Sequence, residues 1–140
     1  MSKIMTNLYR RKKPLKMIYL IQNQQKLISL TLSELANPNE PSNWLFVFEL
    51  EQNNGYIYKK QFTDISAYPE SYNRFIITAG IDILFEIEGD YRYTVYQMPN
   101  DLSIDETEGL LVETGKMRLE SIETQLPTFI VNTDAKINKV

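Results

Sequence analysis

The segments GIDILFEIEGDYRYTVY (residues 80–96) and LLVETGKMRLE (residues 110–120) decide the fold of this chain. Apolar and polar side chains alternate in both, which is the pattern of β-strands with one buried face. The side chains expected to face the core here are Ile81, Ile83, Phe85, Ile87, Tyr91, Tyr93 and Val95. Gly89-Asp90 separates two alternating runs and predicts a tight turn between them. Gly115 lies inside the later segment and predicts a bulge or a tight bend.

Similar alternation recurs earlier in the chain and predicts more short strands. The expected strands lie at residues 15–22, 27–32, 44–50, 56–62 and 72–78, the first two forming a hairpin. Asn54-Gly55 is a hairpin signal between two of the runs. Seven or eight strands favour an all-β fold, an antiparallel β-sandwich that is immunoglobulin-like or jelly-roll-like, with a small barrel as the alternative. The expected core includes Phe46, Phe48, Phe75, Ile83, Phe85, Tyr91, Tyr93 and Val95.

Length and composition favour one domain that is stabilised by packing. The chain has 140 residues, 43% of them hydrophobic, which suffices for one core. It contains no Cys and no His, so disulfides, thiolate metal sites and the commonest general base are excluded. We expect no cofactor, because neither a Gly-x-Ser-x-Gly elbow nor a Gly-rich phosphate loop occurs.

Two polar arms flank the expected sandwich domain, which spans residues 15–126. The first arm, residues 1–14, ends in the cations Arg10, Arg11, Lys12 and Lys13, followed by Pro14. The second, residues 127–140, contains the short apolar run Phe129, Ile130 and Val131. The cationic run is either a solvated terminus or a segment that docks on an acidic neighbour. We expect both arms to contact neighbouring subunits.

Charge and hydropathy exclude two classes of partner. The net charge of −3 argues against nucleic acid, because duplex binding needs a basic face. No apolar run approaches the roughly 20 residues needed to span a bilayer, and residues 1–10 lack the apolar run of a secretion signal. The sequence therefore predicts a soluble protein made in a cytoplasm.

Three side-chain groups are candidates for chemistry or binding. The carboxylates of residues 101–108 could hold calcium, but their spacing is not that of an EF-hand, and a solvated loop is the simpler reading. Glu86 and Glu88 lie two apart, on one face of the expected strand, which suggests either a glycosidase pair or two solvated side chains. Trp44 is either a core aromatic or a platform for sugar stacking.

One resemblance sharpens this reading. The motifs FTDISAYPESYNRF (residues 62–75), GDYRYTVY (residues 89–96) and VETGKM (residues 112–117) resemble small β-sandwich virion proteins of tailed bacteriophages that infect Bacteroidota, crAss-like phages included. The similarity covers residues 17–119. It implies a non-enzymatic accessory or connector subunit of a capsid, neck or tail, assembled in the host cytoplasm. It also implies other virion proteins as partners and a homo-oligomer in the particle.

The leading hypothesis is therefore an assembly protein located in the virion. A carbohydrate-binding or receptor-binding module of a phage fibre or surface adhesin is the alternative, motivated by Trp44 and the tyrosines. A glycosidase that uses Glu86 and Glu88 ranks last.

Overall fold

The computed structural model describes residues 16–52 and 55–121, which form seven β-strands and one short 3₁₀ helix. The strands are β1 (Lys16–Ile21), β2 (Gln25–Leu30), β3 (Asn43–Leu50), β4 (Ile57–Phe62), β5 (Asn73–Thr78), β6 (Gly89–Met98) and β7 (Leu110–Glu120). The 3₁₀ helix η1 spans Glu106–Glu108. The prediction of an all-β sandwich is confirmed. Both expected arms lie outside the described residues.

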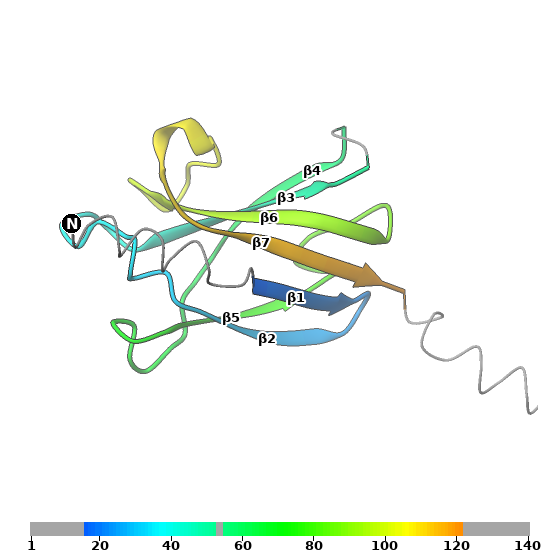
Figure 1. Cartoon of the computed structure of the whole chain (residues 1–140), viewed down its shortest axis with the longest axis horizontal. Coiled ribbons are helices and arrows are strands. Elements are labelled where there is room, and N and C mark those ends of the chain that lie inside the picture. Colours follow the sequence, from blue (N-terminus) through cyan, green and yellow to red (C-terminus); the bar gives the residue numbers. More distant parts are fainter. Residues whose placement is uncertain (1–15, 53–54, 122–140) are drawn as a thin grey trace, which may run out of the picture.

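The strands form two sheets that pack face to face (Figure 1). One sheet has five strands in the order β1-β7-β6-β3-β4, and the other contains β2 and β5. Every pair is antiparallel except β1 with β7, which runs parallel from Lys16 opposite Gly115 to Ile21 opposite Glu120. The five-stranded sheet therefore ends at β1 on one side and at β4 on the other.

This strand order is that of an immunoglobulin-like sandwich. With β2, β3, β4, β5, β6 and β7 taken as strands B, C, C′, E, F and G, one sheet is GFCC′ and the other is BE. Trp44 on β3 is buried, as is the characteristic Trp of strand C. The Tyr91 hydroxyl, near the start of β6, donates a hydrogen bond to the backbone oxygen of Ile87, which is the tyrosine-corner contact of this fold. Tyr93 lies two residues after Tyr91, where antibody domains have a cysteine.

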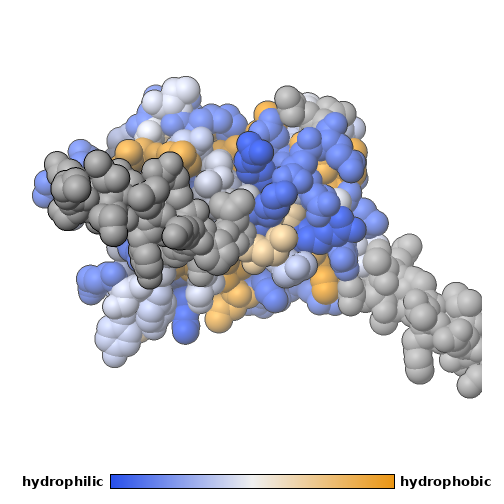
Figure 2. Space-filling model, in the orientation of Figure 1, coloured by the Kyte–Doolittle hydropathy of each residue, from blue (hydrophilic) through white to orange (hydrophobic). Residues whose placement is uncertain are grey.

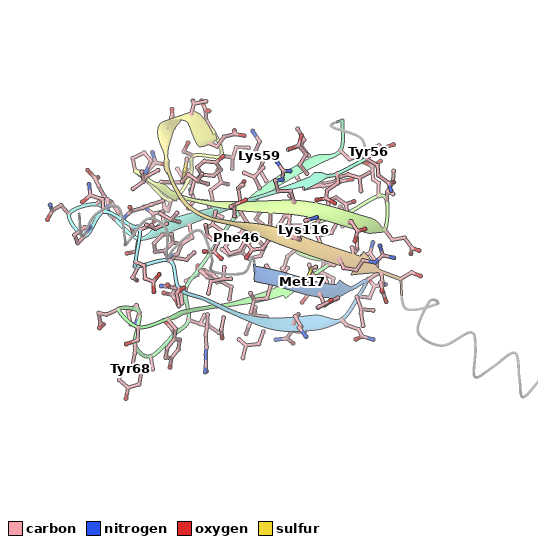
Figure 3. The ribbon with its side chains drawn as sticks, in the orientation of Figure 1. Met17, Phe46, Tyr56, Lys59, Tyr68 and Lys116 are labelled. Carbon is pink, nitrogen blue, oxygen red and sulfur yellow. The ribbon has the colours of Figure 1, made fainter. Side chains whose placement is uncertain are left out.

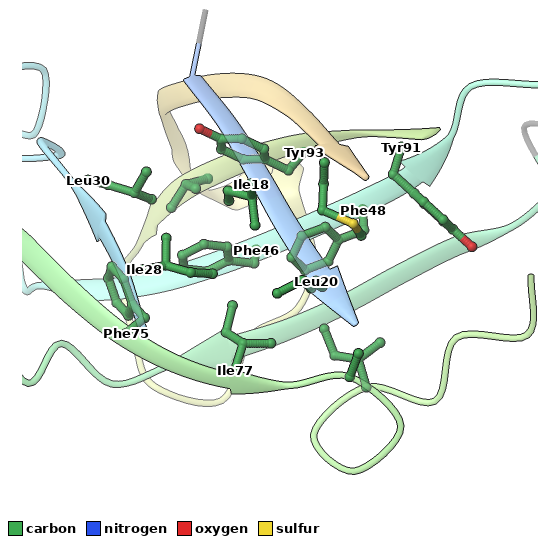
Figure 4. Packing of buried hydrophobic residues seen from close by; sticks show 14 of the residues in the cluster. Ile18, Leu20, Ile28, Leu30, Phe46, Phe48, Phe75, Ile77, Tyr91 and Tyr93 are labelled. Atoms are coloured by element: carbon green, nitrogen blue, oxygen red, sulfur yellow. The ribbon is translucent and has the colours of Figure 1, made fainter. Parts of the chain in front are cut away.

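Aromatic and aliphatic side chains from both sheets fill the space between them (Figure 4). Phe46 meets Phe75 of the opposite sheet edge to face, with ring centroids 5.0 Å apart, and Phe62 at 5.3 Å. Phe85 packs in the same way against Phe48 and Tyr91. Eight of the residues expected in the core are buried there: Phe46, Phe48, Phe75, Ile83, Phe85, Tyr91, Tyr93 and Val95.

A smaller apolar cluster lies on the outer face of the five-stranded sheet. Leu45 and Val47 of β3 point away from the main core, yet they are buried with Met98. Tyr96 packs against them. A strand that is apolar on both faces needs cover on both. The segment of residues 44–50 is therefore almost entirely apolar because its side chains belong to two clusters, one on each face of the sheet.

The expected hairpin of residues 15–32 is wrong. β1 and β2 follow each other through a turn at Asn23, whose φ of 66° is left-handed, but they pair in different sheets. β1 pairs with β7, and β2 pairs with β5. Alternation within each strand cannot reveal this, because the same apolar face can serve either sheet.

The expected strand over residues 81–87 and the turn at Gly89-Asp90 are also wrong. Residues 80–88 form turns and bends with one isolated bridge between Ala79 and Ile83. Ile83 and Phe85 are buried, whereas Ile81 is exposed. Gly89, with a φ of 141°, and Asp90 begin β6 instead of turning the chain. The connection needs these residues to cross from one sheet to the other.

The bulge expected at Gly115 lies elsewhere in β7. Gly115 pairs regularly with Tyr93. The register shifts between Val95, which faces Glu113, and Tyr96, which faces Leu111. Val112 is thus the extra residue, and it is buried in the core. At the expected 52–55 hairpin, Gly55 lies in the turn between β3 and β4, while Asn54 is outside the described residues.

Candidate interaction surface

The acidic loop, residues 99–109, is fastened to the edge strand β4 by side-chain hydrogen bonds. Gln61 Nε2 donates to the backbone oxygens of Asn100 at 3.0 Å and Ser103 at 2.8 Å. Asn100 Oδ1 in turn accepts from the backbone N–H groups of Leu102 at 2.9 Å and Ser103 at 2.8 Å. Because both backbone and side-chain partners fix it, the tip of the loop has a defined conformation.

A second fastening is ionic. Lys59 Nζ of β4 lies 2.6 Å from Glu106 Oε1 in η1, and Figure 3 shows Lys59 beside the loop. The hydrogen bond from Lys59 lowers the pKa of Glu106. Hydrogen bonds from Thr107 likewise lower the pKa of Asp105, which caps η1. Both carboxyl groups are therefore ionised at neutral pH, and the loop is negatively charged.

The fixed loop presents apolar side chains to solvent. Leu102 is 86% exposed and Ile104 is 55% exposed. Leu110 and Leu111, which start β7 directly after the loop, are also about half exposed. Exposed apolar side chains on a monomer are unremarkable singly, but several on one ordered segment indicate an interaction surface.

Charged side chains form a band across the outer face of the five-stranded sheet. One row across all five strands contains Met17, Lys116, Arg92, Glu49 and Ile57, as the strand registers place them opposite one another. Figure 2 shows hydrophilic side chains gathered on this side of the molecule, with smaller apolar areas around them.

Ion pairs on this face are solvent-exposed and weak. Lys116 Nζ lies 3.5 Å from Glu51, and Arg118 Nη1 lies 3.1 Å from Asp90. Exposed pairs of this kind add little to the stability of a fold, because water screens both charges.

The edge strand β1 also carries exposed apolar side chains. Met17 is 49% exposed and Tyr19 is 59% exposed, while Ile18 and Leu20 are buried. β1 pairs on one side only within the described residues, so its other backbone edge is open to a further strand. β4 is the corresponding open edge on the far side of the sheet.

An aromatic pair lies on the loop between β4 and β5. The rings of Tyr68 and Tyr72 meet at 6.4 Å, and the Arg74 guanidinium lies 4.8 Å from the centre of the Tyr72 ring. Asp64 supports this loop by accepting hydrogen bonds from Ser66, Asn73 and Arg74. Burial alone would raise the pKa of Asp64, but these hydrogen bonds lower it below its ordinary value.

The other candidate site residues from the sequence do not come together in one site. Trp44 is 2% exposed and lies in the main core, so its reading as a sugar platform is wrong. Glu86 and Glu88 are exposed on an irregular segment rather than on one face of a strand, and Glu86 accepts a hydrogen bond from the Tyr58 hydroxyl at 3.3 Å. Arg10, Arg11, Lys12, Lys13, Phe129, Ile130 and Val131 lie outside the described residues.

Residues 16–52 and 55–121 contain neither a candidate metal site nor a candidate membrane-spanning helix. No group of three or more Asp and Glu side chains there is placed to hold a metal ion. No helix in the same ranges is long and apolar enough to cross a membrane.

The sequence predicted the acidic loop, but not its attachment to β4. Asn100 is a local signal for the turn at its tip, because an Asn side chain often accepts hydrogen bonds from the backbone N–H groups that follow it in an Asx turn. Its anchor on Gln61 could not be found, since the two residues are 39 positions apart.

Neither a protein-family model nor a curated protein sequence matches this chain.

Proposed function

We propose that this chain is a non-enzymatic structural subunit of a bacteriophage virion. In this role it is an accessory or connector protein of the capsid, neck or tail, and it binds neighbouring subunits through the sandwich surface and the two flanking segments. The resemblance in residues 62–75, 89–96 and 112–117 suggests the virion. The surface of the sandwich supports the assembly role.

The observation that carries the assembly role is the exposure of apolar side chains on ordered elements. Met17 and Tyr19 extend along β1, and Leu102 and Ile104 extend from the fastened loop. Leu27 and Ile76, paired across β2 and β5, are exposed on the opposite sheet. Burying such side chains against a partner yields about 25 cal/mol per Å² of apolar surface.

The open sheet edges offer a second means of attachment. An extended segment of a neighbouring subunit can add a strand at β1 or β4 through backbone hydrogen bonds. The flanking side chains Met17 and Tyr19 would then select the partner, because backbone hydrogen bonds alone carry little sequence information.

Incorporation into particles tests this proposal. Phage particles are purified from cells that produce the full chain, and the chain is quantified by mass spectrometry against a known capsid protein. We expect it at a fixed stoichiometry, and we expect a variant lacking residues 1–13 to be reduced at least tenfold. Absence of the full chain from the particles would overturn the virion role.

A glycan-binding module is the second candidate, and the Tyr68–Tyr72 pair favours it. Tyr68 is exposed, and the Arg74 guanidinium packs over one face of the Tyr72 ring. Aromatic faces on an ordered loop are suitable for stacking against sugar rings. Binding on a glycan array that disappears in Tyr68→Ala, with an unchanged melting temperature, would support it. Tyr19→Ala, on the distant strand β1, is the matched control.

A further inference from the structure

We infer that the acidic loop with its exposed leucine and isoleucine is the docking site for the basic segment 1–13 of a second copy of this chain. This inference rests on the proposed assembly function and names the partner and the acceptor surface. Leu102 and Ile104 would supply apolar contact, and the neighbouring carboxylates would supply charge.

Charge complementarity points to this segment as the occupant. Five of the fifteen cations and none of the eighteen carboxylates lie in residues 1–13, so the rest of the chain has a net charge of −8. The loop has the opposite character, because the four carboxylates of Asp101, Asp105, Glu106 and Glu108 together remain negatively charged after Lys59 has paired with Glu106. Opposite charges of this size accelerate encounter and select the partner.

The apolar residues of the two segments also match. The cations of residues 10–13 follow Ile4, Met5, Leu8 and Tyr9 in the sequence. The loop offers Leu102, the most exposed of its large apolar side chains at 86%, next to Asp101. Since Asn100 and Gln61 already hold this tip in place, little conformational entropy is lost on the loop side when a partner binds.

The position of the loop favours a second copy over the same chain. The loop is fastened to β4, whereas residue 15 leads into β1 at the opposite edge of the five-stranded sheet. A segment of the same chain would have to span the width of the sheet, from β1 past β7, β6 and β3, to reach the part of the loop that is held at β4. A segment from a neighbouring copy can approach β4 from its open side.

Complementation between two full-length variants tests the inference. One variant, Arg11→Glu/Lys12→Glu, has an impaired segment and an intact loop. The other, Asp101→Lys/Leu102→Ser, has an impaired loop and an intact segment. Their masses are measured by sedimentation velocity, alone and mixed in equal amounts.

We expect the unmodified chain to associate with rising concentration and each variant alone to remain monomeric. We expect the mixture to form a complex of one copy of each, because only one productive contact remains. Raising the salt concentration from about 0.05 M to about 0.5 M should weaken this complex on the order of tenfold, since exposed charges are then screened. A mixture without complex, or an unmodified chain that stays monomeric throughout, would overturn the inference.

A matched control separates this surface from general changes in charge and hydropathy. Leu84→Ser/Glu88→Lys makes the same two exchanges on the segment between β5 and β6, where Leu84 is 70% exposed. We expect this variant to associate like the unmodified chain, and equal melting temperatures establish that all variants fold. Failure of complementation leaves the particle experiment above unaffected, so the two proposals fail separately.

Discussion

The hydroxyl of Tyr91 donates a hydrogen bond to the backbone oxygen of Ile87, four residues earlier in the chain. The ring of Tyr91 is fully buried and packs against Phe85 at 5.3 Å. The hydrogen bond therefore holds the end of the irregular connection, residues 80–88, against the start of β6. It does so with a side chain that also belongs to the core.

Removing this hydroxyl should destabilise the fold without changing it. In Tyr91→Phe the ring still fills its site, but the Ile87 carbonyl loses a buried donor, which costs about 1–3 kcal/mol. Urea unfolding measured by circular dichroism checks this value. Tyr19→Phe, at an exposed hydroxyl, should change the unfolding free energy by less than about 0.5 kcal/mol. Equal stability of the two variants would contradict a stabilising role for the Tyr91–Ile87 hydrogen bond.

Alkaline pH should destabilise the protein through its buried tyrosines. Burial raises the pKa of Tyr91 to about 12, and burial together with the nearby Glu113 raises the pKa of Tyr93 above its ordinary value. In the unfolded chain both ionise near pH 10, so the folded state holds protons that the unfolded state has released. The stabilisation is complete below pH 10 and is lost as pH rises through the folded-state values.

The measurement is the unfolding free energy between about pH 9 and pH 12, followed together with tyrosinate absorbance. Part of the absorbance should appear only as the protein unfolds. Tyr91→Phe should show a shallower decline of stability over this range. An identical slope in the variant would show that Tyr91 is ionised freely in the folded state.

Acid should destabilise the protein through Asp64, because the pKa of this carboxyl group is lowered in the folded state, whereas the pKa values of the two tyrosines are raised. Its pKa is lowered in the folded state, so the stabilisation is present above the unfolded value near 3.9 and is lost as pH falls through the folded value. Asp64→Asn should lower the unfolding free energy at neutral pH by about 1–3 kcal/mol, because the hydrogen bonds to Ser66 and Arg74 lose their charged acceptor.

The same variant should also be less sensitive to pH below about 4. Chemical unfolding at several pH values checks both effects. Glu70→Gln, at an exposed position of the same loop, is the control and should leave the curve unchanged. A variant as acid-sensitive as the unmodified protein would argue against Asp64.

Gln97 should be as important as a core residue. It is 4% exposed, its Oε1 accepts from the Asn37 N–H at 2.7 Å, and its Nε2 donates to the oxygens of Asn37 at 2.9 Å and Pro41 at 3.0 Å. In Gln97→Leu these loop groups lose their partner, and we expect a loss of about 1–3 kcal/mol. Thermal unfolding measures it, and Gln52→Leu, at an exposed site, should have little effect.

Local alternation predicted the strands and their buried faces, because a period of two depends only on neighbouring residues. Tyr91, Tyr93 and Val95 show this on β6, where all three are fully buried. Which strands pair with each other was not predictable from local alternation. β1 joins β7 rather than β2, and this choice depends on residues about a hundred positions apart.

The segment of residues 80–88 shows a different limit. Its alternating side chains resemble a strand, and Ile83 and Phe85 do reach the core, but the backbone must cross between sheets and cannot pair along its length. The attachment of the acidic loop to β4 was missed for a related reason. The charges of the loop are visible in sequence, whereas the anchor Gln61 comes from a strand that only the fold brings near.

The parallel alignment of β1 and β7 has a mechanical consequence. Tension applied through residue 15 and residue 122 would pull the two strands in opposite directions along their common axis. The force would then act in shear on all six residue pairs from Lys16–Gly115 to Ile21–Glu120 at the same time, and the pairs would not separate one after another. A chain that is held at both of these positions would therefore resist mechanical separation of β1 from β7.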